Sequence, residues 1–448
     1  MNNKNTSLQN LHWSKYNKIL KSKKYGYLLY NSLTNSLANL DNGTYSEIQK
    51  IKKDPKNYDY SKKPMLYLQL LQNKILAAPN EEEDTINQRK LKKRQQQYDS
   101  HKLTLAIAPT TACNFNCSYC FEANKKSSFI TEEIENEIIN FIKRFFPLKG
   151  MHINWYGGEP LLAFDKIKSL NKKIEDLDVP YQSSIITNGY LFDTNKIKEL
   201  KDLKLQLLQI TVDGPAEIHN QRRTLKNGKG TYQQIMNNIS EILSSDWTGI
   251  LKLRVNVDRN NLQSFAEFYQ KTKKEFPSEQ LKIYPGIISD LSQDNLDLGC
   301  AFDRAEEMNF YLKLFEDYGI KADSFYPARK VQSCIADTKN AYVIGPTGNL
   351  YKCLNDIGVE KMKVGNITNQ QVENRDLLSR YLIASDHYQI EECKNCFYLP
   401  VCNGGCPKKR IKNLAGDKNE DFCLKFKGNF KKMLETYYQI KMENNESN

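Results

Sequence analysis

Between Lys102 and Pro285, six short apolar runs typical of β-strands alternate with longer amphipathic segments. The runs are Leu103–Ile107, His152–Trp155, Ser183–Ile186, Leu205–Val212, Leu251–Val257 and Leu281–Pro285. Repeated strand–helix units predict a parallel sheet, because parallel neighbours need a crossover that a helix normally supplies. Six strands are too few for a closed eight-stranded barrel, so we expect an α/β fold with a partial (β/α)6 barrel of TIM type.

The crossover after the first run carries the pattern of a helix. Thr131 is a suitable N-cap residue, and Ile134, Ile138 and Phe141 recur on one face at helical spacing. In folds built from such units the active site lies at the carboxyl ends of the strands. The loops after the runs are therefore the place to look for functional residues.

Residues 1–78 predict a small winged-helix-like module. Two stretches rich in aromatic and β-branched residues, 16–21 and 25–40, favour strands. A short helix is expected from Thr44, which is a candidate N-cap, and residues 64–78 predict a helix that runs into a strand. Residues 79–101 are almost wholly polar and predict a solvent-exposed linker, with a composition that also suits a helix.

The chain thus divides into five predicted segments. They are the module (1–78), the linker (79–101), the partial barrel (102–320), a loop-rich and cysteine-dense region (321–430), and a C-terminal helix end with a tail (431–448). The cysteine-dense region has too few apolar residues for much of a core, so we expect it to fold around metal.

Composition limits where the protein acts and what it binds. The N-terminus lacks the apolar region of a secretory signal, and no run is long enough to span a membrane, so a cytoplasmic location is expected. Eleven cysteines in such a chain favour metal binding or catalysis over disulfides. The net charge is +12, but the basic runs 89–94 and 408–410 are short, so neither nucleic acid nor membrane is expected as a partner.

Residues 113–120 read CNFNCSYC and follow the first strand directly. Cys113, Cys117 and Cys120 have the spacing C-x3-C-x2-C. Iron–sulfur clusters of the 4Fe-4S type normally take four thiolates, so three ligands leave one iron open for a substrate or cofactor. A zinc site that borrows a distant fourth ligand is the alternative.

This loop resembles that of the radical S-adenosylmethionine (radical SAM) enzymes. The resemblance implies that Cys113, Cys117 and Cys120 are catalytic and hold a 4Fe-4S cluster whose open iron binds the amino and carboxylate groups of SAM. It also implies that SAM is cleaved to a 5′-deoxyadenosyl radical, which abstracts hydrogen from the substrate. Radical chemistry of this kind belongs to the cofactor, while the protein positions and shields it.

Further motifs of the same family follow in order along the chain. The segment Gly157-Gly158-Glu159-Pro160 follows the second strand, and by resemblance it contacts the methionine amino group of SAM. Thr187 and Asn188 end the third strand and are further SAM-binding candidates. Ordinary turn chemistry at strand ends is the competing interpretation of Thr187 and Asn188.

Four more residues are SAM-binding candidates by resemblance. Thr211 and Asp213, at the end of the fourth strand, are expected near the SAM ribose and carboxylate, although turn chemistry also explains Asp213. Arg223 is expected to reach the SAM carboxylate. Tyr119 either stacks near adenine or packs the loop, and His219 is interpreted as structural.

The C-terminal cysteines form a second array. Residues 393–406 read CKNCFYLPVCNGGC, Cys423 follows, and Cys334 and Cys353 precede them. The array resembles the SPASM extension of radical SAM enzymes, which carries two auxiliary 4Fe-4S clusters, whereas a double zinc site is the alternative. By resemblance Cys393, Cys396, Cys402 and Cys423 hold one cluster, and Cys334, Cys353 and Cys406 hold three irons of the other.

The second ligand set lacks its fourth cysteine. Related enzymes have a further Cys shortly before the position of Cys334, where this chain reads YPARKVQS. We therefore expect an open iron in that cluster, available to a substrate thiolate or another residue. Cys300 is the remaining unassigned cysteine and lies far upstream, so it is either that ligand or a small buried residue.

The resemblance indicates an oxidoreductase-type maturase of ribosomally made peptides (RiPPs) that joins a cysteine sulfur or a side-chain carbon to another carbon. The N-terminal module resembles leader-recognition domains, so a precursor peptide with a leader is the expected partner. An electron donor such as flavodoxin or ferredoxin is also expected.

Anaerobic sulfatase maturases are the enzyme alternative. By resemblance they have an Asp after the Cys that matches Cys353, whereas this chain has Leu354 there, and Asp356 is out of register. A zinc-loaded nucleic-acid-binding module is the non-enzyme alternative.

The loop assignment predicts that Cys113→Ala abolishes SAM cleavage while the auxiliary clusters remain. The reason is that this substitution removes one ligand of the SAM-binding cluster alone. Iron analysis and an assay of 5′-deoxyadenosine test this prediction together. A fall of iron to zero would show that the sites are not separate.

The array assignment predicts that Cys396→Ala lowers iron content and solubility but spares the SAM-binding cluster. Metal binding is coupled to folding in segments with little apolar core, so loss of a ligand loosens the region. Iron content per chain is the measurement. Unchanged iron would refute the ligand role of Cys396.

Overall fold

The structure is a computed structural model that describes residues 10–120, 126–288, 302–322, 324–329, 331, 333–369, 373–416 and 420–446. Its chain divides into two compact units. The terminal unit comprises residues 1–97, 323–334 and 383–448, and the sheet unit comprises residues 98–322 and 335–382. Cys300 lies outside the described residues. This division is coarser than the five predicted segments, whose bounds stay a prediction.

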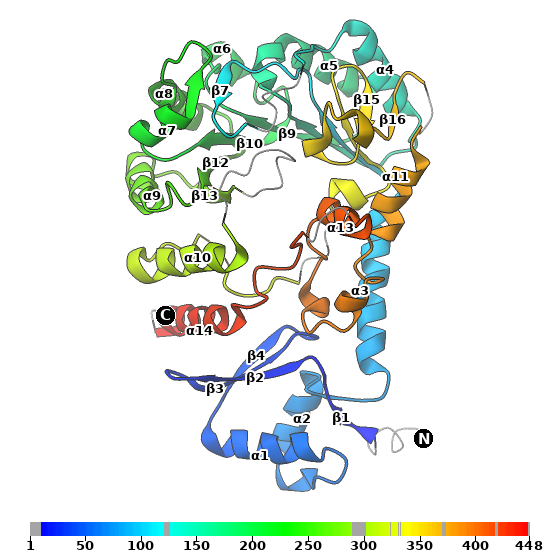
Figure 1. Cartoon of the computed structure of the whole chain (residues 1–448), viewed down its shortest axis with the longest axis vertical. Helices are drawn as coiled ribbons and strands as arrows, with labels where there is room; N and C mark the ends of the chain where they lie inside the picture. Colours follow the sequence, from blue (N-terminus) through cyan, green and yellow to red (C-terminus); the bar gives the residue numbers. More distant parts are fainter. Residues whose placement is uncertain are drawn as a thin grey trace. The chain divides into compact units, whose positions relative to one another are not determined.

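The sheet unit is built on one nine-stranded sheet with the order β13-β12-β10-β9-β8-β6-β14-β15-β16 (Figure 1). Its strands are β6 Lys102–Ile107, β8 Gly150–Trp155, β9 Tyr181–Thr187, β10 Leu205–Val212, β12 Ile250–Val257, β13 Leu281–Ile287, β14 Ala341–Ile344, β15 Asn349–Tyr351 and β16 Gly365–Asn366.

The first six of these strands are the six predicted ones, and each pairs in parallel with its neighbour. β14 then pairs in parallel with β6, while β15 and β16 add antiparallel strands. The described strands form an open mixed sheet and no closed barrel. The prediction of a partial barrel is confirmed, and the sheet also continues into strands that follow the barrel.

The crossovers of the sheet unit are helical. Their helices are α4 Glu132–Lys143, α5 Phe164–Glu175, α6 Thr194–Lys198, α7 Ala216–Arg222, α8 Tyr232–Ser244, α9 Ser264–Glu275, α10 Arg304–Tyr318 and α11 Arg375–Ser379. Thr131 caps α4 by accepting a hydrogen bond from the Ile134 amide, as predicted. Ile138 and Phe141 are buried on the helix face that meets the sheet unit's core.

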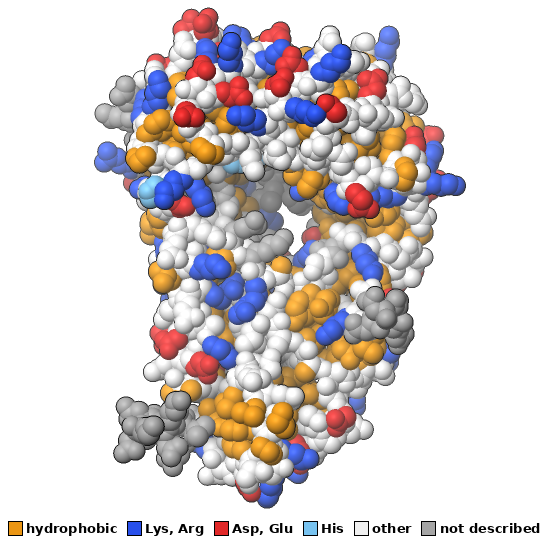
Figure 2. Space-filling view, turned by 180° about the vertical axis from the view of Figure 1, so that it is seen from behind, with side chains coloured by type: hydrophobic (Ala, Val, Ile, Leu, Met, Phe, Trp, Pro, Cys, Tyr) orange, Lys and Arg blue, Asp and Glu red, His pale blue; other side chains and the backbone are white. Residues whose placement is uncertain are grey.

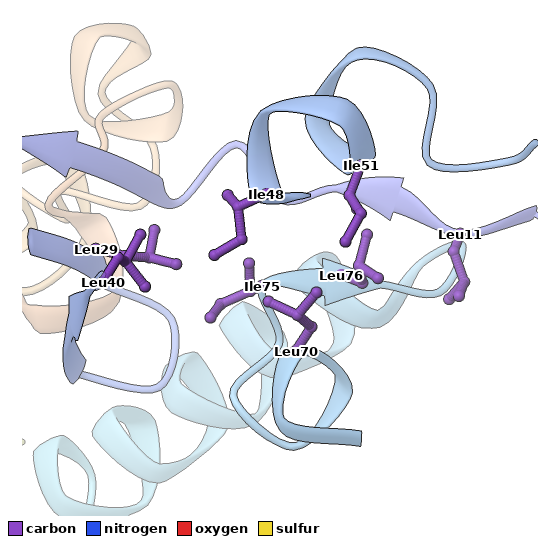
Figure 3. Packing of buried hydrophobic residues seen from close by; sticks show 8 residues of the cluster. All are labelled: Leu11, Leu29, Leu40, Ile48, Ile51, Leu70, Ile75 and Leu76. Carbon is purple, nitrogen blue, oxygen red and sulfur yellow. The ribbon is translucent and has the colours of Figure 1, made fainter. Parts of the chain in front are cut away.

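The terminal unit begins with a three-stranded antiparallel sheet, β2 Asn17–Ser22, β3 Gly26–Asn31 and β4 Ser36–Leu40, with β3 in the middle. β1 His12–Trp13 pairs with β5 Leu76–Ala77, and helices α1 Asn42–Lys53 and α2 Pro64–Gln72 lie between. Figure 3 shows Leu29 and Leu40 from the strands facing Ile48 of α1, with Leu70 of α2 nearby. This apolar cluster gives the small module a core of its own.

The start of α1 differs from the prediction. The N-cap is Asp41, whose carboxylate accepts from the Thr44 amide and hydroxyl, so Thr44 is not the cap. Both residue types suit the position, and a carboxylate near the helix N-terminus gains from the helix dipole. The sequence therefore predicted this helix but placed its N-cap three residues too late in the chain.

The segment predicted as an exposed linker is a 17-residue helix, α3 Glu81–Gln97. One side of it is buried, including Lys93 at 5% exposure and Gln97 at 3%. Lys93 lies beside His387, and Arg94 forms an ion pair with Asp386. The helix is thus packed along one side within the terminal unit. Composition alone did not predict this packing, because the buried residues of the helix are polar.

The cysteine-dense part of the terminal unit is mostly irregular, with helices α12 Glu391–Lys394, α13 Pro407–Leu414 and α14 Phe430–Glu446. The N-terminal strands pack against it through aromatic rings. The ring centroid of Tyr30 is 4.9 Å from that of Phe430 and 6.0 Å from that of Phe397. The Ser32 hydroxyl also donates to the Phe397 carbonyl at 2.6 Å.

Two observations concern the hydropathy of the helices and the charge of the surface. No helix in the described part of the chain is long and apolar enough to cross a bilayer. On the face in Figure 2, Lys and Arg side chains are scattered among Asp and Glu and form no continuous basic band.

Candidate active site

A cavity of about 390 Å³ lies at the carboxyl ends of the parallel strands in the sheet unit. Its volume is within the usual range for small-ligand sites. Ten of the predicted site residues line it: Cys113, Cys117, Tyr119, Cys120, Gly157, Gly158, Thr187, Asn188, Thr211 and Arg223. The fold therefore brings together motifs that are up to 110 positions apart in sequence.

The three-cysteine loop is fixed by a short strand pair. β7 Phe115–Cys117 pairs with β11 Arg223–Leu225, which sets Cys117 opposite Arg223. The Phe115 amide donates to Cys113 Sγ at 3.4 Å, and the Cys120 amide donates to the Cys117 carbonyl at 3.2 Å. Burial raises the pKa of Cys113 to about 12 and also raises that of Cys117. Such thiols form thiolates when a bound metal supplies positive charge, so this donor set fits an iron–sulfur cluster.

The double glycine lies directly against this loop. A Cβ on Gly157, where φ is +135°, would be 2.3 Å from the Thr110 carbonyl oxygen. A Cβ on Gly158 would be 2.3 Å from the Ala112 carbonyl oxygen. The Gly158 and Glu159 amides donate to these two carbonyls at 3.1 and 2.8 Å. Any side chain at these positions would push the cysteine loop away.

Glu159 is 0% exposed and does not line the cavity. One carboxylate oxygen accepts from the Thr187 hydroxyl at 2.6 Å and the Leu161 amide at 3.0 Å, and the other accepts from the Asn188 amide at 2.7 Å. Burial raises its pKa. In the structure this carboxylate joins the double-glycine turn to the end of β9. Pro160 is also buried and starts the following 3-10 turn, away from the cavity lining.

Asp213 is likewise 0% exposed and lies behind the cavity wall. Its carboxylate accepts from Arg222 Nε and from the Tyr119 hydroxyl, each at 2.8 Å. The Tyr119 hydroxyl in turn accepts from Arg223 Nη1 at 2.8 Å and Asn256 Nδ2 at 2.9 Å. This network fixes both Tyr119 and Arg223, so Asp213 acts on the cavity through its neighbours.

Residues 107–271 match the family described as the radical SAM superfamily. The chain contains a radical SAM domain. The matched segment runs from the end of β6 into α9 and includes all three loop cysteines, the double glycine and the Asp213 network.

Several similar proteins extend beyond this domain. The chain is 25% identical over 365 residues to a cysteine-type anaerobic sulfatase-maturating enzyme of Clostridium novyi (strain NT), covering 74% of this chain and 95% of that protein. It is 24% identical over 359 residues to a serine-type anaerobic sulfatase-maturating enzyme of Bacteroides thetaiotaomicron, covering 70% of this chain and 84% of that protein.

Two solved structures share the fold. The structure of anSMEcpe with bound AdoMet superposes with a TM-score of 0.59 at 22% identity, covering 77% of this chain and 94% of that one. The structure of SuiB from Streptococcus suis, bound to precursor peptide SuiA, gives a TM-score of 0.50 at 16% identity, covering 91% of this chain and 97% of that one.

The radical SAM domain has polar cavity residues that the sequence did not single out. Gln209 of β10, and Arg254 and Asn256 of β12, line the cavity. Arg254 Nε donates to Asn256 Oδ1 at 2.8 Å. Each is a polar residue in the carboxyl-terminal half of its strand, as is Thr211. Together with Arg223, Arg254 gives the cavity two cations that suit a carboxylate ligand.

Outside the radical SAM domain, four predicted ligands surround a small cavity in the terminal unit: Cys393, Cys396, Cys402 and Cys423. Backbone amides donate to two of the sulfurs, from Gly404 to Cys402 at 3.1 Å and from Tyr398 to Cys396 at 3.4 Å. Four thiols around one cavity are the donor set of a 4Fe-4S cluster and equally of a structural zinc site.

The other three C-terminal cysteines are divided between the units. Cys334 and Cys406 belong to the terminal unit, and Cys353 belongs to the sheet unit. Their shared ligand set therefore stays a prediction.

His219 is a buried histidine of the radical SAM domain. It is 0% exposed, accepts from the Asp213 amide through Nδ1 at 3.2 Å and bonds the Thr231 hydroxyl through Nε2. Burial, then the charges of Arg223 and Arg222, lower its pKa from 6.5 to about 3. The unfolded chain therefore takes up a proton below about pH 6.5 that the folded protein excludes.

We expect the contribution of His219 to be fully present above about pH 6.5 and to be lost as pH falls toward 3, at about 1.4 kcal/mol per pH unit. Replacing it by Gln removes the titration, so the free energy of unfolding should fall less steeply with acid in His219→Gln than in the unmutated protein. Denaturant unfolding between about pH 7 and 5 measures both slopes. Equal slopes would contradict the buried neutral state.

Proposed function

We propose that this chain is a radical SAM enzyme that modifies a ribosomally synthesised precursor peptide, by forming a thioether or another side-chain cross-link. One observation carries the proposal. The cavity is bordered by three cysteines, two arginines and a double glycine. Such a site suits an iron–sulfur cluster with SAM, because thiolates bind iron, guanidinium groups pair with a carboxylate, and glycine lets a ligand approach the backbone closely.

The residues present fit the cofactors that this function requires. Cys113, Cys117 and Cys120 would hold a 4Fe-4S cluster, and the bare backbone of Gly157 and Gly158 would let SAM approach closely. When bound, cluster and SAM together supply a 5′-deoxyadenosyl radical that abstracts hydrogen. The chain's own part is to orient SAM, with Arg223 and Arg254 as partners of its carboxylate, and to limit access of water.

The sheet unit offers an argument against sulfatase maturation. Leu354 and Asn355 line the cavity, whereas Asp356 is 0% exposed and accepts from the Tyr381 hydroxyl at 2.9 Å. The residue after Cys353 therefore brings no base to the cavity. Sulfatase maturation remains the second candidate because the similar curated enzymes from Clostridium and Bacteroides carry out that reaction.

The four-cysteine cavity of the terminal unit would hold an auxiliary 4Fe-4S cluster, and Cys334, Cys353 and Cys406 would ligate a second one with an open iron. A cysteine thiolate of the peptide is a chemically suitable fourth ligand. A cytoplasmic electron carrier such as flavodoxin or ferredoxin would reduce the enzyme.

The N-terminal module would hold the leader of the precursor peptide. In its three-stranded sheet, β2 and β4 are edge strands, and Ala38 and Asn39 of β4 are exposed. An extended leader can add a strand to such an edge. The structure of SuiB bound to precursor peptide SuiA covers 91% of this chain against 77% for anSMEcpe, which supports a precursor peptide as the substrate.

The test is co-expression of the enzyme with short peptides encoded beside its gene, under anaerobic conditions, followed by mass spectrometry. A cross-link removes two hydrogens per event, and fragmentation of the product locates the new bond. We expect this loss with the unmutated enzyme and none with Cys113→Ala, which serves as the matched control.

Conversion of serine to formylglycine also removes two hydrogens, so the product must be treated with a hydrazide reagent. A hydrazide-reactive aldehyde would establish the sulfatase-type alternative. An unchanged mass, together with no deuterium uptake from heavy water, would overturn peptide modification and point to a folded protein substrate.

A further inference from the structure

His387 is a buried histidine in the wall of the four-cysteine cavity. Its side chain is 1% exposed, and it lines this cavity together with Cys393, Cys396, Cys402 and Cys423. The ligand assignment gives it no role. Its environment lies wholly in the terminal unit, where α3 packs beside it.

The protonation of the ring follows from its neighbour Lys93. The Lys93 ammonium lies 3.3 Å from His387 Nδ1, and both side chains are buried. An ammonium can only donate a hydrogen bond, so Nδ1 must accept it. In a neutral imidazole the proton is then on Nε2.

Nε2 of His387 has no hydrogen-bond partner in the structure. An N–H donor buried without an acceptor costs about 1–3 kcal/mol, so such a group normally has an acceptor when the protein is complete. The backbone of Cys402 is also close to the ring and offers one acceptor. A sulfur of a cluster held in the cavity would be the other.

The ring is held firmly in this position. A Cβ on Gly404, where φ is +84°, would be 2.6 Å from the His387 ring, so only glycine leaves it room. The Arg410 guanidinium donates to the carbonyls of Ser385 and Gly405 on either side, at 2.6 and 2.9 Å. The imidazole is thus held in place by the backbone at Gly404, by the segments that Arg410 joins and by Lys93.

We infer that Nε2–H of His387 donates a hydrogen bond to a sulfur of the cluster held by Cys393, Cys396, Cys402 and Cys423, and thereby raises its reduction potential. A hydrogen bond to sulfur stabilises the reduced state more than the oxidised state, because the reduced cluster carries one more negative charge. His387 is a tuning residue rather than a catalytic one. The inference rests on the proposed function, which places a cluster in this cavity.

The experiment is a redox titration of the whole enzyme followed by electron paramagnetic resonance (EPR). The signal that is missing in Cys396→Ala belongs to this cluster. At a fixed solution potential we expect His387→Phe to have a tenfold lower ratio of reduced to oxidised cluster, equivalent to about 59 mV for one electron. His387→Gln, which keeps an N–H near the position of Nε2, should recover most of this loss.

Tyr398→Phe is the matched control. Tyr398 lines the same cavity, but its hydroxyl points to the Phe426 carbonyl at 3.4 Å. Removal of this hydroxyl should leave the potential of the cluster unchanged.

An unchanged potential in His387→Phe, at full iron content, would overturn the inference and leave the Cys402 carbonyl as the acceptor. If no signal disappears in Cys396→Ala, the cluster assignment itself fails, which is a separate outcome.

A second measurement covers the case in which His387→Phe loses the cluster. Pulsed EPR of the unmutated enzyme with ¹⁵N-histidine should detect an exchangeable proton and a weak ¹⁵N coupling at this cluster. Detection of both supports the hydrogen bond, and absence of any histidine coupling overturns it.

Discussion

The close approach of two backbones is the constraint on which the candidate active site depends. At Gly157 and Gly158 the turn after β8 meets the carbonyls of Thr110 and Ala112 so closely that no side chain fits between them. The cysteine loop is thereby fixed against the turn after β8, in addition to the β7–β11 pairing and the hydrogen bonds of Tyr119. Sites built on regular elements are held more precisely than sites on free loops.

Two buried carboxylates complete this support. Glu159 joins the double-glycine turn to the end of β9, and Asp213 holds Tyr119 and, through it, Arg223. Both are fully buried, and each accepts several hydrogen bonds, which is the condition under which a buried charge is tolerated. In this structure both carboxylates connect the elements around the cavity, while the SAM contacts that the family resemblance assigns to them stay a prediction.

The two units use buried histidines in different ways. His219 has both ring nitrogens paired, so it is a structural group whose effect is a pH-dependent stability. His387 has one nitrogen paired with Lys93 and the other without a hydrogen-bond partner, and the residue lines a cavity together with four cysteines. The two histidines differ in Nε2, which is hydrogen-bonded in His219 and has no hydrogen-bond partner in His387. We therefore assign His219 to the stability of the fold and His387 to a cofactor.

The sequence by itself determined the six parallel strands, the helix cap at Thr131 and ten of the residues that border the cavity, because periodicity, capping and motif order are local properties. Only the tertiary structure decided which motif residues border the cavity, since Glu159, Pro160 and Asp213 lie within two positions of lining residues but are not among them. It also decided that α3 is packed rather than exposed, because Lys93 is buried against His387, nearly 300 positions away. Arg254 was missed for the same reason: the role of a polar residue on a strand depends on the direction of its side chain and on the neighbours that the fold brings to it.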